Sequence, residues 1–153
     1  MNQNLFAELP LVPELLRAIG EMGFFEPTPI QAQSIPLILE GRDVVGRSQT
    51  GTGKTAAFGI PAIQMVDPNL DRRMAQILLL YPTRELAVQA CEELKKLAHH
   101  TRGVHVCAVY GGAPIERQIV QLKDANIVVG TPGRVMDHLR RRTLKIKSEA
   151  KRS

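Results

Sequence analysis

The 153-residue sequence has few of the features that define several large classes of protein. Cysteine occurs only as Cys91 and Cys107, which excludes a disulfide framework and a paired-cysteine metal site. The longest purely apolar run, residues 77–81, is far too short to span a membrane. The first residues carry no basic segment followed by an apolar one, so no secretory signal is recognised. A cytoplasmic protein is therefore expected.

What the sequence does contain is an ordinary globular composition. Hydrophobic residues make up 44% and charged residues 23%, which excludes wholesale disorder. The length fits one domain or a piece of a larger one.

The net charge of +5 is concentrated at one end of the chain. Residues 140–153 contain seven basic residues and one acidic residue, so the preceding residues are slightly acidic. A basic tail can hold nucleic acid electrostatically, but a run of like charge is more often only solvated. We expect residues 143–153 to be disordered.

Short apolar runs predict four strands, at residues 43–46, 77–81, 104–110 and 127–130. They are apolar on both faces, which is typical of a buried parallel sheet. Helical patterns follow three of them, at residues 54–66, 83–100 and 114–123. This alternation predicts an α/β fold with a parallel sheet flanked by helices.

Two further helices are predicted before the first strand, at residues 13–22 and 28–39. Gly23 lies where it can stop the first helix. Pro29 suits the first position of the second helix, and Pro36 is expected to kink or divide it.

A glycine-rich segment joins the first strand to the helix at residues 54–66. It reads Ser48, Gln49, Thr50, Gly51, Thr52, Gly53, Lys54 and Thr55. Glycines let backbone N–H groups turn inward around an anion, and the following helix N-terminus attracts phosphate. The pattern predicts a phosphate-binding loop in which Lys54 reaches the β and γ phosphates and Thr55 holds Mg²⁺. Ser48 replaces the glycine of the strict pattern, and the alternative is a turn without a ligand.

A second segment, residues 23–31, has two interpretations. Thr28 and Gln31 have the spacing of a capping box, which is a sufficient structural reason for both. Alternatively, the Gln31 amide binds the edge of an adenine and Phe24 stacks on the base.

Together these segments resemble the motifs of DEAD-box RNA helicases. Phe6 followed by residues 23–31 resembles the Q motif, and residues 48–55 resemble motif I. Residues 82–89 resemble motif Ia, residues 131–134 resemble motif Ib, and Gly111-Gly112 lies where the family has a double-glycine turn. The motifs occur in the family's order, and the resemblance runs from about residue 6 to about residue 142.

The resemblance implies an incomplete RecA-like domain that binds ATP with Mg²⁺ and the backbone of single-stranded RNA. For ATP it implies Phe6, Phe24, Gln31 and residues 48–55, with Lys54 and Thr55 positioning phosphate and metal. For RNA it implies Pro82, Thr83, Arg84, Gly111, Gly112, Thr131, Pro132, Gly133 and Arg134. The implied organisation is a helical Q-motif region at residues 1–41, the partial domain at residues 42–142, and the tail.

The residues implied for RNA also have plain structural interpretations. Thr83 can cap its helix, Arg84 can pair with Glu85 or Glu92, and Pro132-Gly133 can simply begin a helix. The other polar residues suggest no further site. The four histidines lack metal-ligand spacing, Asp137 fits a helix surface, and both cysteines fit a buried core.

No apolar strand ending in paired acids follows residue 134, and the family's Asp-Glu-Ala-Asp box, Ser-Ala-Thr segment and second domain are not found. We therefore expect an N-terminal fragment that binds ATP and RNA without hydrolysis or unwinding, so enzyme activity is left open. Two alternatives remain: a non-catalytic RNA- or partner-binding module, and another P-loop NTPase or kinase.

Overall fold

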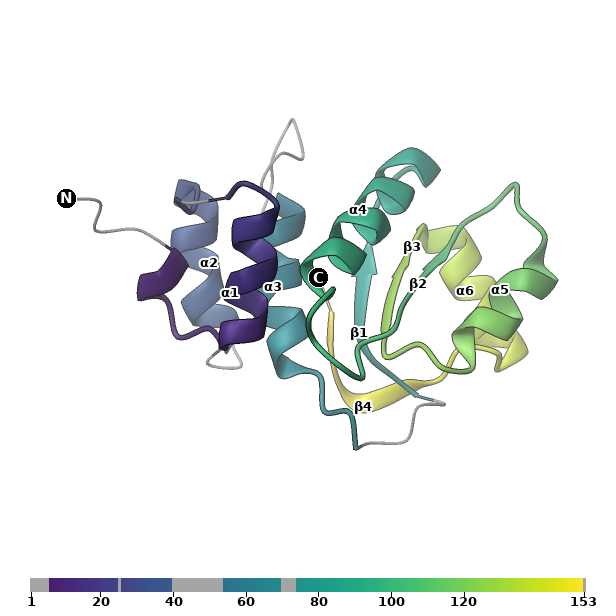
Figure 1. Ribbon diagram of the computed structural model, residues 1–153. Coiled ribbons are helices and arrows are strands. Elements are labelled where there is room, and N and C mark those ends of the chain that lie inside the picture. The colour runs from purple at the N-terminus through teal and green to yellow at the C-terminus, as the bar shows by residue number, and fades with distance from the viewer. Residues whose placement is uncertain (1–5, 25, 40–53, 70–73, 153) are drawn as a thin grey trace. The chain divides into compact units, whose positions relative to one another are not determined.

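A computed structural model describes residues 6–24, 26–39, 54–69 and 74–152 of the chain (Figure 1). The chain divides into two compact units. Unit 1 comprises residues 1–65 and 93–102, and unit 2 comprises residues 66–92 and 103–153. The predicted strand at residues 43–46 lies outside the described residues.

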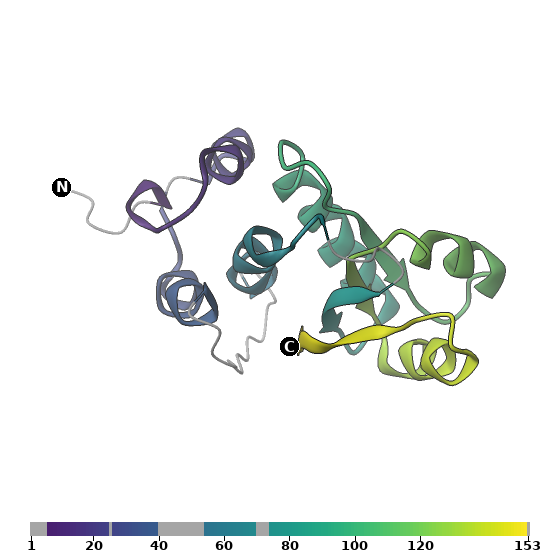
Figure 2. The same cartoon turned by 90° about the horizontal axis from the view of Figure 1, so that it is seen from below.

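Unit 1 is helical. It contains η1 (Phe6–Glu8), α1 (Pro13–Glu21), α2 (Pro29–Leu39), α3 (Lys54–Met65) and the last turns of α4 (Arg84–Leu97). Helices α2 and α3 pack against each other (Figure 2). Fully buried side chains supply the core of this unit: Leu15, Ile19, Ile35, Ile60, Ile63, Leu94 and Leu97.

The end of α1 confirms the predicted stop at Gly23. Gly23 has φ +81°, which glycine adopts without a Cβ clash. The Gly23 N–H donates to the Gly20 carbonyl at 3.0 Å, and the Phe24 N–H donates to the Ile19 carbonyl at 3.2 Å. These two bonds form a Schellman motif, which satisfies the last carbonyls of the helix.

Helix α2 begins at Pro29, as the sequence predicts. The sequence predicts that Pro36 kinks or divides this helix, and division is wrong, because α2 continues through it to Leu39. A proline removes one helical hydrogen bond, and the burial of Ser34 and Ile35 beside it supplies packing that offsets the loss.

Unit 2 is a four-stranded sheet with helices, in the strand order β2-β3-β1-β4. Its strands are β1 (Ala75–Leu80), β2 (Val106–Val109), β3 (Ile127–Gly130) and β4 (Ile146–Arg152), and its helices are the start of α4, α5 (Ile115–Leu122) and α6 (Pro132–Arg141). All described pairings are parallel, which confirms the predicted α/β fold. Figure 1 shows α5 and α6 beside this sheet.

Strand β3 and most of β1 are buried on both faces, as their apolar sequences predict. One face carries Leu78, Val128 and Cys107 in register across β1, β3 and β2. It packs with Leu122 of α5 and Val135 of α6 into one buried cluster. The alternate positions of β1 and β3 are buried as well: Ile77, Leu79, Ile127 and Val129.

The expectation of a disordered segment at residues 143–153 differs from the structure. Residues 146–152 form β4, which pairs in parallel with β1. The Ala75 N–H donates to the Lys145 carbonyl at 2.7 Å where this pairing begins. An unpaired edge of β1 would offer a row of main-chain donors and acceptors, so pairing there depends little on side-chain composition. Within the described residues, no helix has the length and apolar character needed to cross a membrane.

Candidate functional site

The carboxyl ends of three strands meet at one edge of unit 2. Leu80 of β1 pairs with Gly130 of β3, which pairs with Val109 of β2. The pairing continues past the strand ends, since the Tyr81 N–H donates to the Gly130 carbonyl at 2.9 Å. The Thr131 N–H similarly donates to the Val109 carbonyl at 3.1 Å. The three segments implied for RNA binding therefore start side by side, and we call this the carboxyl edge.

The segment after β1 leads directly into α4. The Thr83 hydroxyl oxygen accepts a hydrogen bond from the Leu86 N–H at 3.2 Å, which confirms its capping role. Within the described residues, Arg84 forms no ion pair with Glu85 or Glu92. Its guanidinium instead lies over the Tyr110 ring, 5.0 Å from the centroid, and its side chain is exposed.

The segment after β2 is the double-glycine turn. Gly112 has φ +84°, a left-handed conformation that favours glycine. A Cβ added there would lie 3.1 Å from Nη1 of Arg84, whereas one added at Gly111 would meet nothing within 4 Å. A side chain at Gly112 would therefore crowd the Arg84 guanidinium, which lies beside the turn.

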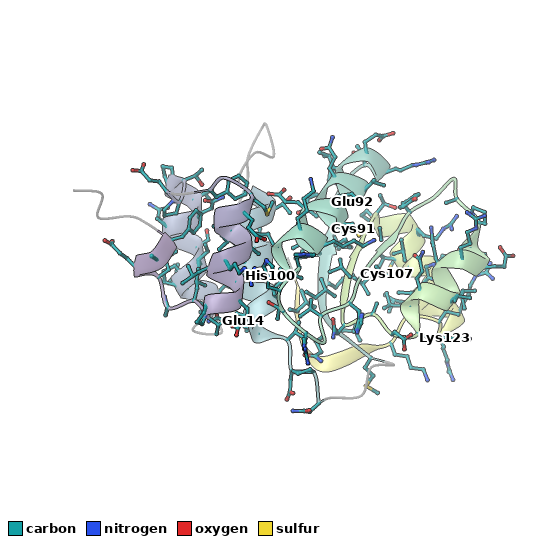
Figure 3. The ribbon with its side chains drawn as sticks, viewed as in Figure 1. Glu14, Cys91, Glu92, His100, Cys107 and Lys123 are labelled. Atoms are coloured by element: carbon teal, nitrogen blue, oxygen red, sulfur yellow. The ribbon has the colours of Figure 1, made fainter. Side chains whose placement is uncertain are left out.

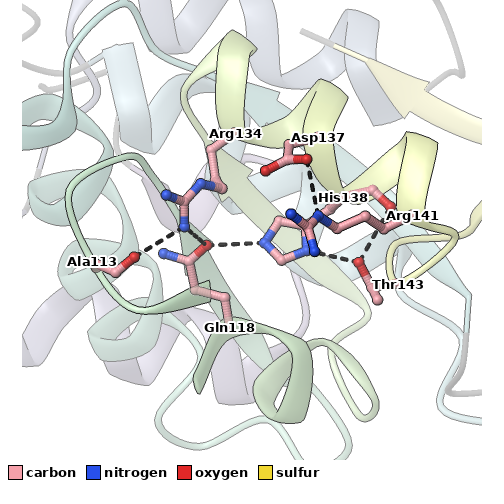
Figure 4. Close-up of polar contacts among 7 residues, drawn as sticks. All are labelled: Ala113, Gln118, Arg134, Asp137, His138, Arg141 and Thr143. Atoms are coloured by element: carbon pink, nitrogen blue, oxygen red, sulfur yellow. Dashed lines mark hydrogen bonds and ion pairs between the residues drawn. The ribbon is translucent and has the colours of Figure 1, made fainter. Parts of the chain in front are cut away.

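The segment after β3 begins α6. Thr131 is extended at the N-cap, where its side chain makes no capping bond, and Pro132 occupies the first turn. The plain interpretation of Pro132-Gly133 as a helix start is confirmed. Nη1 of Arg134 donates to the Ala113 carbonyl at 3.1 Å and to Oε1 of Gln118 at 3.2 Å (Figure 4). Arg134 therefore fastens α6 to the chain just after the glycine turn.

Two buried polar residues that sequence reasoning missed lie beneath this edge. Gln118 of α5 is 3% exposed and His138 of α6 is fully buried. Nε2 of Gln118 donates to the Tyr110 carbonyl at 2.9 Å, and Oε1 lies 2.9 Å from Nε2 of His138. Their spacing could have indicated burial, because Gln118 lies one helical turn from the buried Leu122 and His138 lies one turn from the buried Val135.

The charges around His138 favour its neutral form. Burial lowers the pKa of His138, and the neighbouring Arg134 guanidinium lowers it further. The Asp137 carboxylate opposes this shift, although it is itself paired with Nε of Arg141 at 3.0 Å. That hydrogen bond also lowers the pKa of Asp137, and it fits the predicted helix-surface role.

The residues implied for adenine lie in unit 1. The capping box is confirmed: the Thr28 N–H donates to Oε1 of Gln31 at 2.9 Å, and the Gln31 N–H donates to the Thr28 hydroxyl at 3.4 Å. Gln31 is buried, Phe6 in η1 is 3% exposed, and Phe24 is half-buried. Phe6 therefore serves the packing of this unit.

Residues 48–53 of the predicted phosphate-binding loop lie outside the described residues. Helix α3 begins at Lys54, where the sequence predicts a helix N-terminus directly after the loop. Thr55 lies in the first turn and is buried. A helix start at this point fits the donor arrangement that a triphosphate requires.

The remaining candidates for chemistry have structural roles. Both cysteines are buried, Cys91 on α4 and Cys107 on β2, as the sequence predicts (Figure 3). Within the part of the chain that the structure describes, no group of three or more His, Cys, Asp or Glu side chains could hold a metal ion.

Comparisons with known proteins agree with the motifs. Residues 28–150 match the family described as DEAD/DEAH box helicase. The chain is 53% identical to the ATP-dependent RNA helicase CshA of Listeria monocytogenes over 92% of its length, covering 27% of that relative. It is 50% identical to the ATP-dependent RNA helicase DeaD of Escherichia coli over 93% of its length, covering 22% of that relative.

A solved structure gives the same result for the fold. A DEAD box protein from Methanococcus jannaschii matches with a TM-score of 0.84 and 44% identity, over 92% of this chain and 38% of that chain. The expected RecA-like fold is thereby confirmed for a partial domain, and the chain spans about a quarter of the length of the curated relatives. The chain belongs to the DEAD/DEAH box helicase family.

Proposed function

We propose that this chain is the part of an ATP-dependent RNA helicase that binds ATP and the backbone of single-stranded RNA. The carboxyl edge of unit 2 would contact the RNA through Pro82, Thr83, Arg84, Gly111, Gly112, Thr131, Pro132, Gly133 and Arg134. The observation that carries this proposal is the meeting of these three segments at one edge of a parallel sheet.

The chemistry of the carboxyl edge suits a phosphate backbone. Two helices, α4 and α6, begin there, and helix N-termini attract anions. Arg84 adds an exposed positive charge next to the glycine turn, where main-chain groups are accessible. Contacts of this kind hold a strand without reading its sequence, so we expect binding that depends on RNA backbone and not on base identity.

ATP would be held in unit 1 by residues 48–55, with Thr55 as a ligand of Mg²⁺. Gln31 would recognise adenine through its side-chain amide, which carries both a donor and an acceptor. Phe24 would stack on the base. Bound Mg²⁺ neutralises charge on the phosphates, while the residues of this chain position them.

Binding without turnover is the expected behaviour of these 153 residues alone. Phosphoryl transfer needs a carboxylate to hold the metal and a group to orient water, and the sequence has no Asp-Glu-Ala-Asp segment. Phosphate release from ATP with saturating RNA should stay at background. Clear turnover by the pure chain would contradict the expectation that these residues bind ATP without hydrolysing it.

RNA binding is tested by fluorescence anisotropy with a labelled single-stranded oligouridine of about 10 nucleotides. We expect Arg84→Gln to weaken binding about tenfold, because it removes a charge-assisted hydrogen bond to phosphate. The slope of log affinity against log salt should fall by about 0.7, the value for one phosphate contact on a single strand.

The matched control is Lys123→Gln, which removes the same charge from an exposed position just after α5 (Figure 3). Lys123 precedes β3 and so lies toward the opposite end of the strands from the carboxyl edge. The RNA affinity and salt slope of the Lys123→Gln variant should match those of the unaltered chain. Equal losses for both variants would mean that binding is non-specific attraction, and the carboxyl edge would not be the RNA site.

A further inference from the structure

A chain of hydrogen bonds runs beneath the carboxyl edge and links α5, α6 and the glycine turn (Figure 4). Gln118 is its centre: Nε2 donates to the Tyr110 carbonyl, and Oε1 lies within hydrogen-bond distance of Arg134 and His138. At the other end, Nδ1 of His138 lies 2.8 Å from the Thr143 hydroxyl, just past the end of α6.

The partners fix the orientation of each group. The Tyr110 carbonyl can only accept and the Arg134 guanidinium can only donate, so the Gln118 amide has one satisfactory orientation. Its Oε1 then accepts from Nε2 of His138, which places the proton of the neutral imidazole on Nε2. Nδ1 is left as an acceptor facing the Thr143 hydroxyl at 2.8 Å, and that hydroxyl also lies within donating distance of the His138 carbonyl, at 3.2 Å.

The same chain of hydrogen bonds explains how the Arg134 side chain is held. Nη1 donates to the Ala113 carbonyl and to Gln118, which accounts for two of the five N–H donors of the guanidinium. Among the described residues, no protein acceptor is bonded to Nε or Nη2 of Arg134. One side of the fork is therefore anchored in protein, and the other donors can meet a phosphate oxygen.

We propose that Gln118 and His138 are positioning residues for RNA binding, which hold Arg134 and the Gly111-Gly112 turn in place through a buried hydrogen-bond chain. This rests on the proposed function of the carboxyl edge. Burying two polar side chains is costly unless both are fully bonded, and apolar residues could fill the same space. The bonds of Gln118 and His138 run to Tyr110, Arg134 and Thr143. Arg134 is implied for RNA and Tyr110 directly precedes the glycine turn, so these hydrogen bonds order groups at the carboxyl edge.

The test measures affinity for the labelled oligouridine and the urea midpoint of the full 153-residue chain. His138→Leu and Gln118→Met keep side-chain size but remove the polar atoms. We expect each to weaken RNA binding by the folded chain about tenfold, since each leaves a buried partner unsatisfied. His138→Gln should bind within about twofold of the unaltered chain, because its Nε2 is as many bonds from Cα as Nε2 of the imidazole and can donate to Gln118.

The matched control is Asn126→Ala at the amino end of β3. Asn126 is also a buried polar residue with two side-chain hydrogen bonds, to the Gly103 carbonyl at 2.6 Å and from the His105 N–H at 2.8 Å. The Asn126→Ala substitution should lower the urea midpoint and leave the RNA affinity of the folded chain unchanged. A His138→Leu chain that behaves like this control, less stable with unchanged affinity, would overturn the proposal.

A double variant separates positioning from general destabilisation. If His138 acts through Arg134, His138→Leu should change affinity less than twofold or so once Arg134→Met is present. Full additivity of the two losses would overturn the proposal. If His138→Leu and Gln118→Met do not fold, Thr143→Val provides the test. A loss of about threefold in RNA affinity supports the positioning proposal, and unchanged affinity contradicts it.

Failure of the proposed function is recognised separately. If the unaltered chain does not bind the oligouridine, the carboxyl edge is not an RNA site and the positioning proposal falls with it. If the unaltered chain binds and Arg84→Gln weakens it, while His138→Leu and Gln118→Met do not, only the positioning proposal is overturned.

Discussion

The guanidinium of Arg84 lies over the ring of Tyr110, with its central carbon 5.0 Å from the ring centroid. This contact joins the first turn of α4 to the residue that precedes the glycine turn. Stacking on an aromatic face restrains a long side chain that would otherwise lose considerable rotamer freedom on binding a ligand. Tyr110 therefore helps to preorganise the only exposed arginine at the start of α4.

Replacing Tyr110 tests this relationship. Tyr110→Leu should weaken oligouridine binding about two- to fivefold, since an exposed cation–π contact is worth about 0.5–1 kcal/mol. Tyr110→Phe keeps the ring and should bind like the unaltered chain in the same anisotropy measurement. Equal losses for both would assign the effect to the hydroxyl and not to the ring face.

Substitution by alanine is expected to have opposite effects on stability at Gly130 and at Gly133. A Cβ at Gly130 would lie 2.5 Å from Val135 and 2.8 Å from the Val109 carbonyl, so Gly130→Ala must displace β2 or α6. We expect a loss of about 1–3 kcal/mol in the free energy of unfolding by urea. Gly133→Ala meets nothing within 4 Å and lies in the first turn of α6, so stability should hold or rise slightly.

The regular elements could be predicted because their signals are local. The four-residue run at Ile127–Gly130 is apolar throughout and became β3 with the predicted bounds. Gly23 ended α1 because the Schellman motif places a left-handed residue, most often glycine, just after the helix. The capping box at Thr28 and Gln31 spans only three residues, so its bonds follow directly from the sequence.

The contacts beneath the carboxyl edge could not be predicted because they join residues far apart in the sequence. Gln118 and His138 are twenty positions apart, and nothing in either helix alone indicates the partner. Gln64 is a similar case, since its amide bonds the Pro10 carbonyl and the Val12 N–H ahead of α1. Strand β4 was missed because its pairing uses main-chain groups of β1, which composition does not reveal.

Burial of His138 predicts a pH dependence of stability. Its pKa in the folded chain is lowered from 6.5 by burial and by Arg134, so the unfolded chain binds the proton more readily. The contribution is fully present above pH 6.5 and is lost as the pH falls toward the lowered folded value.

Urea midpoints measured between about pH 7.5 and pH 5.5 check this sign. His138→Gln lacks the titrating group, so its midpoint should fall less over that range than that of the unaltered chain. The difference between the two chains removes the contributions of all titratable groups that both chains retain. A steeper fall in the His138→Gln chain would contradict the prediction.

Arg142 offers a stabilising substitution. It has φ +61° at the end of α6, where a Schellman pair of bonds runs from the Arg142 and Thr143 N–H groups to Leu139 and His138. A left-handed conformation is unfavourable for a residue with a Cβ. Arg142→Gly should therefore raise the free energy of unfolding by about 0.5–1 kcal/mol, measured by urea, whereas Arg142→Ala should bring no gain.

Thr28 and Gln31 separate the structural role of the capping box from nucleotide recognition. Thr28→Ala and Gln31→Ala should each lower the free energy of unfolding by about 1 kcal/mol, because each removes one bond of the box. If Gln31 also recognises adenine, only Gln31→Ala should weaken binding of Mg-ATP, measured by calorimetry at a temperature where both chains are folded. Gln31 should likewise favour ATP over GTP, since the purine edges present different donors and acceptors, and that preference should disappear in Gln31→Ala alone. Equal ATP affinities for the two variants would leave Gln31 with the capping role only.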